Sequence, residues 1–237
     1  MRHPWTTAAL VIAATAWAIG CGGGSASGDA SRAPSTTSAP STSTTPVSSA
    51  PRIVILGDSL TAGLGLPIDQ AYPSLIQARL TKAGLNYEVV NAGVSGDTSA
   101  GGLSRLDWAL QGDVRVLVVA LGGNDALRGL PPTQLEQNLA AIVERAQAKG
   151  IRVVLAGMES PPNWGRDYNV SFHRVYTSLA TKYRVPLVPF LLAGVAGTEA
   201  LNQPDGIHPT AAGARIVADN VWAVLEPLLQ ETGRSGS

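Results

Sequence analysis

The sequence predicts an α/β fold, a flavodoxin-like three-layer α/β/α sandwich built on a five-stranded parallel sheet. Three observations lead to this prediction. Short apolar runs rich in β-branched residues alternate with segments of helical periodicity along most of the chain. The runs are continuous rather than alternating, which is typical of strands that helices cover on both faces. The connections between runs and helices are short, and such alternation favours parallel strands joined by right-handed crossovers.

Each expected element follows from its own stretch of sequence. The strands are expected at Ile53–Leu56, Tyr87–Asn91, Val114–Leu121, Ile151–Ala156 and Pro186–Val188. The helices are expected near Ala71–Lys82, Ser99–Leu110, Thr133–Lys149 and Asn169–Tyr183, with a last one from Pro209 to about Leu225.

The helix expected over Thr133–Lys149 carries the clearest signals. Thr133 and Glu136 have the spacing of a capping box at its start, and Gly150 is suited to end it. One face is apolar at helical spacing, with Leu135, Leu139, Ile142 and Ala146. These signals predict the beginning, the buried face and the end of this helix.

The first residues of the chain are not expected to belong to the fold. A weakly basic start precedes an apolar run from Ala8 to Ile19, which is shorter than the roughly 20 residues of a membrane-spanning helix and fits an export signal. Ala18-Ile19-Gly20-Cys21 resembles the lipobox of bacterial lipoproteins, in which the cysteine carries lipid. We therefore expect residues 1–21 to be a lipoprotein-type signal peptide. The alternative is a general secretory signal with an incidental cysteine.

The expected lipidation at Cys21 implies an exported, membrane-anchored lipoprotein on the periplasmic or cell-surface side. Residues 22–51 consist almost entirely of Gly, Ser, Thr, Ala and Pro, and such a segment buries too little apolar surface to fold, so it is expected to be a disordered tether. Cys21 is the only cysteine, which excludes an internal disulfide. Residues 52–231 suffice for one domain, and residues 232–237 are expected to be a flexible tail.

The charge pattern bears on the class of partner. The chain has 17 basic and 17 acidic residues and a formal net charge of zero, without a basic cluster. Nucleic acid is therefore not an expected partner. We expect a monomer that needs no cofactor.

Four short segments carry the chemistry. Three of them follow expected strands, namely Gly57-Asp58-Ser59-Leu60, Asn91 to Thr98, and Leu121-Gly122-Gly123-Asn124-Asp125. The carboxyl ends of parallel strands share one edge of the sheet, where the ligands of such folds bind. The fourth, Asp205-Gly206-Ile207-His208, precedes the last helix. Serine, aspartate and histidine in this order are the parts of an acyl-transfer enzyme.

Together the four segments resemble those of the SGNH/GDSL hydrolases, and in particular the bacterial thioesterase, lysophospholipase and arylesterase branch. The resemblance covers nearly all of residues 52–229 and includes Asn163-Trp164-Gly165-Arg166. It implies the SGNH hydrolase fold and a serine esterase that cleaves carboxylic esters or thioesters through an acyl-enzyme. The chain has no GxSxG motif, which argues against the α/β-hydrolase family.

On this resemblance Ser59 is the nucleophile, His208 the general base and Asp205 the carboxylate that orients the imidazole. Pro209 suits a first helical position, which would put His208 at or near a helix N-cap. A helix N-terminus disfavours imidazolium, so the resting base is expected to be neutral. The alternative is a capping arrangement of Asp205 and His208 that does not touch Ser59.

The resemblance also implies an oxyanion hole made by the Ser59 N–H, the Gly96 N–H and the Asn124 amide. Gly96 lies in Ser95-Gly96-Asp97-Thr98, where glycine lets the backbone approach a substrate closely. The alternatives are an ordinary turn glycine at Gly96 and a turn residue at Asn124.

The remaining polar residues have simpler interpretations. Asp58 is expected to orient backbone in a turn and Asp125 to cap a helix or turn. The chain has neither an HxH nor an HExxH pattern, so no metal is expected. His173, in a helical stretch, is expected to be a surface or packing residue.

Two loops are expected to contact substrate, although both could be simple connections. In the resembling enzymes the loop after the third segment lies along the acyl chain, and here it contains Leu127, Arg128 and Leu130. The loop with Asn163 and Trp164 follows the fourth strand and should reach the same edge. Lysophospholipids, acyl thioesters and short aryl esters are the expected substrates. The alternatives are a carbohydrate O-deacetylase of the same fold and a non-catalytic lipid-binding lipoprotein.

Overall fold

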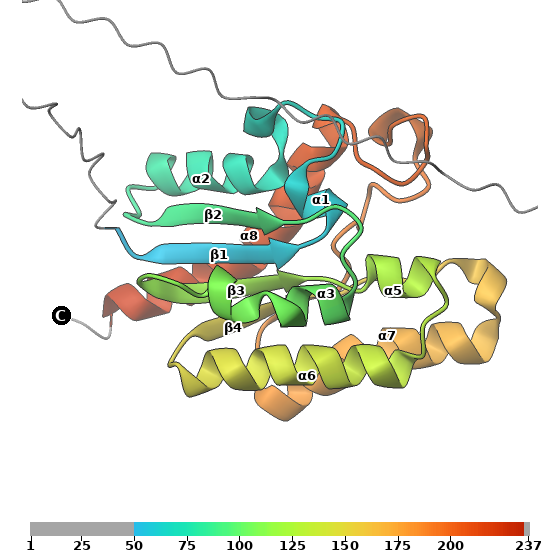
Figure 1. Ribbon diagram of the computed structural model, residues 1–237. Coiled ribbons are helices and arrows are strands. Elements are labelled where there is room, and N and C mark those ends of the chain that lie inside the picture. The colour runs from blue at the N-terminus through green and yellow to red at the C-terminus, as the bar shows by residue number, and fades with distance from the viewer. Residues whose placement is uncertain (1–49, 235–237) are drawn as a thin grey trace, which may run out of the picture. The chain divides into compact units, whose positions relative to one another are not determined.

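The computed structural model describes residues 50–234 (Figure 1), so the expected signal peptide with Cys21 and nearly all of the expected tether lie outside the described residues. Five strands form one sheet in the order β2-β1-β3-β4-β5, and every pair is parallel. This is the flavodoxin-like order. The strands are β1 (Arg52–Gly57), β2 (Glu88–Gly93), β3 (Val114–Ala120), β4 (Arg152–Ala156) and β5 (Leu187–Val188).

Helices cover both faces of the sheet. On one face α2 (Tyr72–Lys82) packs against α8 (Ala211–Arg234), and on the other α6 (Pro132–Ala148) packs between α3 (Ser99–Ser104) and α7 (Arg166–Tyr183) (Figure 1). The central strands are therefore buried on both sides, and Ile53–Leu56 has no exposed surface. The predicted five-stranded, three-layer α/β/α architecture is confirmed.

Short helical pieces complete the fold, and several lie beside the carboxyl ends of the strands. They are α1 (Ser59–Ala62), α4 (Leu106–Ala109), α5 (Gly123–Leu127), and the 3-10 turns η1 (Ile68–Gln70), η2 (Pro162–Trp164) and η3 (Glu199–Leu201).

Two helix predictions need correction at their boundaries. The single helix expected over Ser99–Leu110 is broken at Arg105 into α3 and α4, because Arg105 has φ −106° and ψ 8° and turns its side chain toward β1. The prediction of a capping box that begins at Thr133 is wrong. Helix α6 begins at Pro132, whose fixed φ suits the first helical position, and its N-cap residue Pro131 makes no side-chain cap.

The last helix also differs from its prediction. It begins at Ala211, because Pro209 pairs with Asn202 in an antiparallel bridge. Pro209 is therefore not the first helical residue, and His208 lies three residues before Ala211, near the start of the helix but not at its N-cap. The helix continues to Arg234, so the expected tail is helical over 232–234, whereas 235–237 lie outside the described residues.

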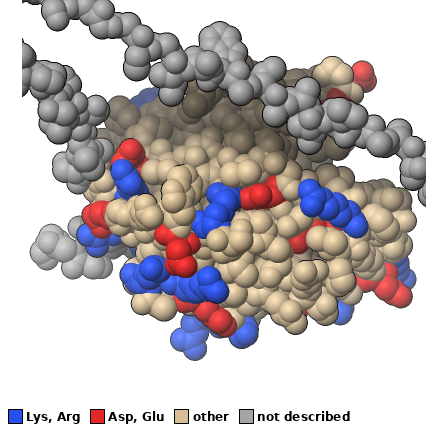
Figure 2. All heavy atoms as spheres, in the orientation of Figure 1, with Lys and Arg blue, Asp and Glu red and all other residues tan. Residues whose placement is uncertain are grey.

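The described surface carries charges of both signs. Figure 2 shows Lys and Arg side chains interspersed with Asp and Glu on the face that includes α3 and α6, in keeping with a formal net charge of zero. Among residues 50–234, no helix combines the length and the apolar composition needed to cross a membrane.

Candidate active site

Three strand ends meet at one edge of the sheet. Gly57 at the end of β1 is aligned with Gly93 of β2 and with Ala120 of β3, so the segments that follow them lie side by side. Glycine is needed at the first two positions because α1 packs against them. A Cβ atom at Gly57 would lie 2.0 Å from Thr61 Oγ1, and a Cβ atom at Gly93 would lie 2.2 Å from the backbone nitrogen of Ala62. The absence of these two side chains lets α1 begin directly above the sheet.

A chain of hydrogen bonds joins Ser59, His208 and Asp205. Ser59, the first residue of α1, has its Oγ 2.9 Å from His208 Nε2, and His208 Nδ1 lies 2.7 Å from Asp205 Oδ2. The two distances are those of good hydrogen bonds. The structure thus brings together the three residues predicted from segments 149 positions apart in the sequence.

The Asp205 carboxylate is held in place by the turn that leads to His208. Its Oδ1 accepts hydrogen bonds from the backbone N–H of His208 at 3.0 Å and of Ile207 at 2.9 Å. These bonds, followed by the side-chain bond to His208, lower the pKa of Asp205 to about 2. The carboxylate is therefore ionised at neutral pH and accepts the Nδ1–H of the imidazole. That tautomer leaves Nε2 as an acceptor facing the Ser59 hydroxyl.

The three predicted oxyanion donors, Ser59, Gly96 and Asn124, follow the carboxyl ends of β1, β2 and β3 respectively. Gly96 has a positive φ of 85°, which favours glycine, and the Asn124 side-chain amide donates to the Asp97 carbonyl at 2.9 Å. Within residues 50–234 the N–H groups of Ser59 and Gly96 have no hydrogen-bond acceptor. Both are thus available to a ligand.

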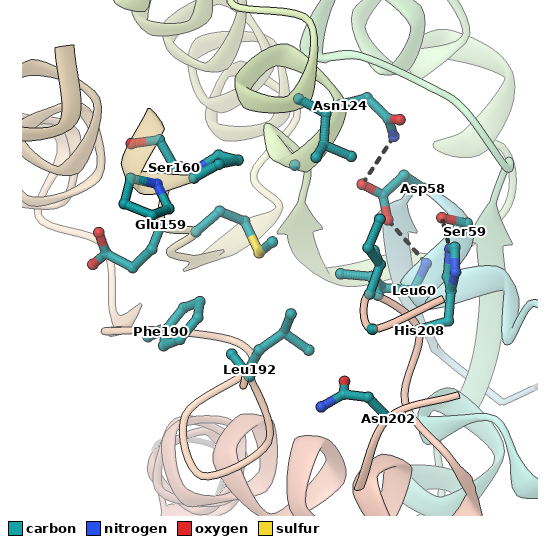
Figure 3. A pocket seen from close by; sticks show the side chains of 18 residues that line it. Asp58, Ser59, Leu60, Asn124, Glu159, Ser160, Phe190, Leu192, Asn202 and His208 are labelled. Atoms are coloured by element: carbon teal, nitrogen blue, oxygen red, sulfur yellow. Dashed lines mark hydrogen bonds between the residues drawn. The ribbon is translucent and has the colours of Figure 1, made fainter. Parts of the chain in front are cut away.

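Asp58 is a buried acid beside the nucleophile. Its Oδ1 accepts from the Leu60 N–H at 3.0 Å, which caps α1, and its Oδ2 accepts from Asn124 Nδ2 at 3.3 Å (Figure 3). Burial raises the pKa of Asp58 to about 6, against the lowering effect of the bond from Leu60. The interpretation of Asp58 as a residue that orients backbone is confirmed.

Asp125 is also buried, and it anchors the loop that carries Gly96. Its two carboxylate oxygens accept from the backbone N–H of Ser99 at 2.8 Å and from the Ser99 hydroxyl at 2.5 Å. Asp125 therefore caps the beginning of α3, a helix distant in sequence, rather than its own turn. The Ser99 hydroxyl in turn accepts from Asn138 Nδ2 at 2.9 Å.

A mostly apolar cavity of about 410 Å³ opens beside Ser59. Figure 3 shows Ser59, His208, Asp58 and Asn124 on one side of it and Glu159, Ser160 and Phe190 on the other. The rest of the lining is Leu60, Gly123, Leu127, Met158, Pro161, Pro162, Leu192, Ala196, Asn202, Gly206 and Ile207. In this arrangement Ser59 Oγ can attack the carbonyl carbon of a substrate whose apolar group occupies the cavity.

Comparison with known proteins decides the family. The profile of the GDSL-like lipase/acylhydrolase family matches residues 55–216, a range that includes every residue of the hydrogen-bonded chain. The chain belongs to the GDSL-like lipase/acylhydrolase family. The family resemblance of the four segments is confirmed, and with it the prediction that the chain is a serine ester hydrolase of SGNH type.

Curated relatives of this GDSL-like hydrolase include two bacterial enzymes. Esterase TesA of Pseudomonas aeruginosa is 48% identical over 183 residues, which are 77% of this chain and 91% of that protein. Thioesterase 1/protease 1/lysophospholipase L1 of Escherichia coli K12 is 39% identical over 183 residues, 77% of this chain and 86% of that protein.

Solved structures agree with the family assignment. The crystal structure of TesA superposes with a TM-score of 0.72 at 47% identity, over 75% of this chain and 99% of that one. AlinE4, an SGNH-hydrolase family esterase, superposes with a TM-score of 0.64 at 43% identity, over 76% of this chain and 97% of that one.

Of the three residues predicted to contact substrate in the loop after β3 of this GDSL-like hydrolase, only Leu127 lines the cavity. Leu127 lines the cavity and is 48% exposed. Arg128 donates to the Gly96 carbonyl at 2.7 Å, and the Leu130 carbonyl accepts from the Tyr168 hydroxyl at 2.9 Å. Neither Arg128 nor Leu130 lines the cavity. Their polar contacts tie this loop to its neighbours.

The loop after β4 contributes through other residues than those predicted. Asn163 and Trp164 do not line the cavity, and the Trp164 ring lies 6.0 Å from that of Tyr168. The lining comes instead from the residues just before them, Met158 to Pro162. His173 pairs with Glu159 at 2.6 Å with half of its side chain exposed, as expected for a surface residue.

Sequence reasoning missed the part of the cavity wall that follows β5. Phe190 and Leu192 lie in the turns after this two-residue strand, and Ile207 lies between Asp205 and His208. Their position after a strand end was the available signal, because every such loop of a parallel sheet reaches the same edge.

Proposed function

We propose that this protein hydrolyses carboxylic esters and thioesters whose acyl group occupies the apolar cavity, through an acyl-enzyme formed on Ser59. The observation that carries the proposal is the hydrogen-bonded chain from Ser59 through His208 to Asp205 at the mouth of that cavity. The names of the relatives, an esterase and a thioesterase/lysophospholipase, support acyl thioesters and lysophospholipids as substrates alongside simple esters.

Acylation begins with the transfer of the Ser59 proton to His208 Nε2 as Oγ attacks the carbonyl carbon. Asp205 accepts the Nδ1–H throughout and offsets the positive charge that the imidazole gains. Breakdown of the tetrahedral intermediate transfers the Nε2 proton to the leaving alcohol or thiol. The acyl group then remains bound to Ser59 as an ester.

The negative oxygen of the intermediate takes its stabilisation from preorganised donors. The N–H groups of Ser59 and Gly96 are unoccupied within the described chain, and Asn124 Nδ2 supplies the third bond. In the absence of substrate this amide also donates to Asp58 at 3.3 Å, the longer of its two bonds and the weaker one. We therefore propose that the oxyanion replaces Asp58 as the acceptor of that longer bond from Asn124 Nδ2.

Deacylation repeats the same proton transfers with water as the nucleophile. His208 Nε2 removes a proton from water, the hydroxide attacks the acyl carbon, and the proton is then returned to Ser59 Oγ as the carboxylic acid leaves. No cofactor enters this sequence of steps. All the groups involved come from one chain, and we propose that the protein acts as a monomer.

The experiment that tests this proposal compares the intact protein with its Ser59→Ala variant on decanoyl-CoA, a lysophospholipid and nitrophenyl esters. We expect the variant to lose at least about 10³-fold in kcat on every substrate, as removal of a nucleophile does in serine hydrolases. Circular dichroism and thermal unfolding of the variant should match the parent. Hydrolysis at the parent rate by Ser59→Ala would overturn the assignment.

We further propose that residues 1–21 direct export and that lipid on Cys21 anchors the enzyme to a membrane. The support is the lipobox-like sequence at residues 18–21 and the Gly/Ser/Thr/Pro-rich stretch between it and the domain. Expression of the full-length chain in a bacterium followed by membrane fractionation tests this. We expect the parent in the membrane fraction with a lipid-modified N-terminal peptide, and Cys21→Ser in the soluble fraction. Parent protein without the lipid mass would contradict the anchor.

A further inference from the structure

The guanidinium of Arg105 joins two of the segments that form the active site. Its Nε donates to Asp97 Oδ2 at 2.6 Å, and its Nη2 donates to the Gly57 carbonyl at 2.9 Å. The side chains of Arg105 and Asp97 are only 18% and 19% exposed. A single side chain therefore connects the end of β1 to the loop after β2 from inside the protein.

Each end of this connection lies next to a proposed oxyanion donor. Gly57 immediately precedes Asp58 and Ser59, so its carbonyl fixes the backbone that presents the Ser59 N–H. Asp97 immediately follows Gly96, and the Asp97 carbonyl accepts from Asn124 Nδ2 at 2.9 Å. The position of Asp97 thus governs both the Gly96 N–H and the direction of the Asn124 amide.

The local backbone is arranged to place this guanidinium. The helical segment breaks at Arg105, between α3 and α4, and the break directs the side chain toward the sheet edge. Its Nη1 is buried, and no hydrogen-bond partner for it lies within the described chain. A buried donor without a partner costs stability. Stability alone therefore does not explain a guanidinium here, whereas its forked geometry explains how one side chain can hold two segments.

We infer that Arg105, acting with Asp97, is a positioning residue that holds the three oxyanion donors at the spacing required by the transition state. The inference rests on the proposed function, because it assumes that Ser59, Gly96 and Asn124 bind the oxyanion. Arg105 itself touches no reacting atom. Arg105 affects the stabilisation of the transition state rather than the binding of the substrate, because neither Arg105 nor Asp97 lines the acyl cavity.

The test compares Arg105→Lys, Arg105→Gln and Asp97→Asn in the intact protein, with kcat and KM measured on one nitrophenyl ester. We expect kcat to fall about 10- to 100-fold in Arg105→Gln, less than for loss of an oxyanion donor itself, with KM within about twofold. The kcat of Arg105→Lys should lie between those of the parent and of Arg105→Gln, because an ammonium keeps the positive charge but lacks the forked donor geometry of a guanidinium. Arg115→Gln is the matched control, because Arg115 forms a solvent-exposed ion pair with Asp113 at the other end of β3. The kcat of this variant should equal that of the parent.

A second measurement separates positioning from folding. An alkyl trifluoromethyl ketone forms a tetrahedral adduct with an active serine, and its inhibition constant should rise by the same factor as kcat/KM falls across the variants. Undiminished kcat in Arg105→Gln and Asp97→Asn, or a loss that disappears after correction for the folded fraction, would overturn the inference. Ser59→Ala is measured beside them. Activity in that variant overturns the proposed function, whereas an inactive Ser59→Ala with full activity in the Arg105 variants overturns only the positioning role.

Discussion

The Asp205 carboxylate contacts His208 twice, once at the imidazole and once at the backbone N–H. Asp205 Oδ2 lies 2.7 Å from Nδ1 of the imidazole, and Oδ1 accepts the backbone N–H of the same residue at 3.0 Å. One carboxylate therefore sets both the position of the His208 backbone and the orientation of its ring. This double contact explains how two residues three apart in an exposed turn can present an imidazole to Ser59.

The first prediction concerns this contact. Asp205→Asn keeps the size of the side chain, but its amide can donate to Nδ1 and so favour the tautomer with its proton on Nε2. We expect kcat to fall by about 10³- to 10⁴-fold, as when the corresponding change is made in a serine protease triad. Steady-state kinetics on a nitrophenyl ester measure this. A loss below tenfold, with the fold intact, would show that the carboxylate does not control the tautomer.

The second prediction concerns the stability contributed by Asp58. Its pKa is raised by burial from 3.8 to about 6 in the folded protein, so folding is favoured while the carboxyl is protonated. This contribution is complete below pH 3.8 and is lost as the pH rises through about 6. The shift corresponds to about 3 kcal/mol, as an order of magnitude.

Asp58→Asn removes this titration, because an amide stays neutral. Relative to the parent, the free energy of unfolding of the variant should increase by about 3 kcal/mol, as an order of magnitude, between pH 4 and pH 7. Urea unfolding at several pH values measures the difference. A difference that does not change with pH would mean that Asp58 titrates normally in the folded state.

The third prediction concerns the anchor between Asp125 and Ser99. In Asp125→Ala the buried N–H and hydroxyl of Ser99 lose their acceptors, and we expect the free energy of unfolding to fall by about 2–4 kcal/mol. Asp113→Ala is the control. Its carboxylate pairs with Arg115 at the surface, so its removal should change stability by less than about 1 kcal/mol. Equal effects of the two substitutions would contradict the anchoring role.

The fourth prediction concerns acyl-chain length. Ala196 is exposed and lines the cavity, so Ala196→Trp fills cavity space without disturbing the core. If the indole displaces two methylenes of the acyl chain, at about 0.8 kcal/mol each, kcat/KM for a decanoyl ester should fall by roughly tenfold. The acetyl ester should be unaffected.

Ala193→Trp provides the matched control for that experiment. Ala193 is exposed in the same turn region but does not line the cavity, so both esters should be cleaved at the parent rate. An equal loss on acetyl and decanoyl esters in Ala196→Trp would show that the acyl chain binds elsewhere.

The sequence predicts the sheet well because its strands are buried on both faces. A continuous apolar run as short and as rich in β-branched residues as Ile53–Leu56 favours a buried strand over a helix, and in the structure it is a fully buried strand. The segment after each strand is predicted for the same reason, since parallel strands bring their ends together. The amino-acid sequence therefore suffices to group Ser59, Gly96 and Asn124 at one edge of the sheet.

Helix boundaries and the cavity wall depend on contacts that a sequence does not display. The break at Arg105 follows from hydrogen bonds to Gly57 and Asp97, which lie on other segments. The start of α8 is delayed by the bridge between Asn202 and Pro209. The wall formed by Phe190 and Leu192 follows a strand of only two residues, whose periodicity is too short to mark where its loop begins.

The central claim is that Ser59 is an activated nucleophile, and covalent labelling tests it most directly. The intact protein is treated with a fluorophosphonate, digested, and the adduct located by mass spectrometry, with His208→Ala and Ser59→Ala treated in parallel. We expect one phosphonate per molecule on the peptide that contains Ser59, much slower labelling in His208→Ala, and none in Ser59→Ala. A folded parent protein that stays unlabelled, or is labelled at another residue, would contradict the account.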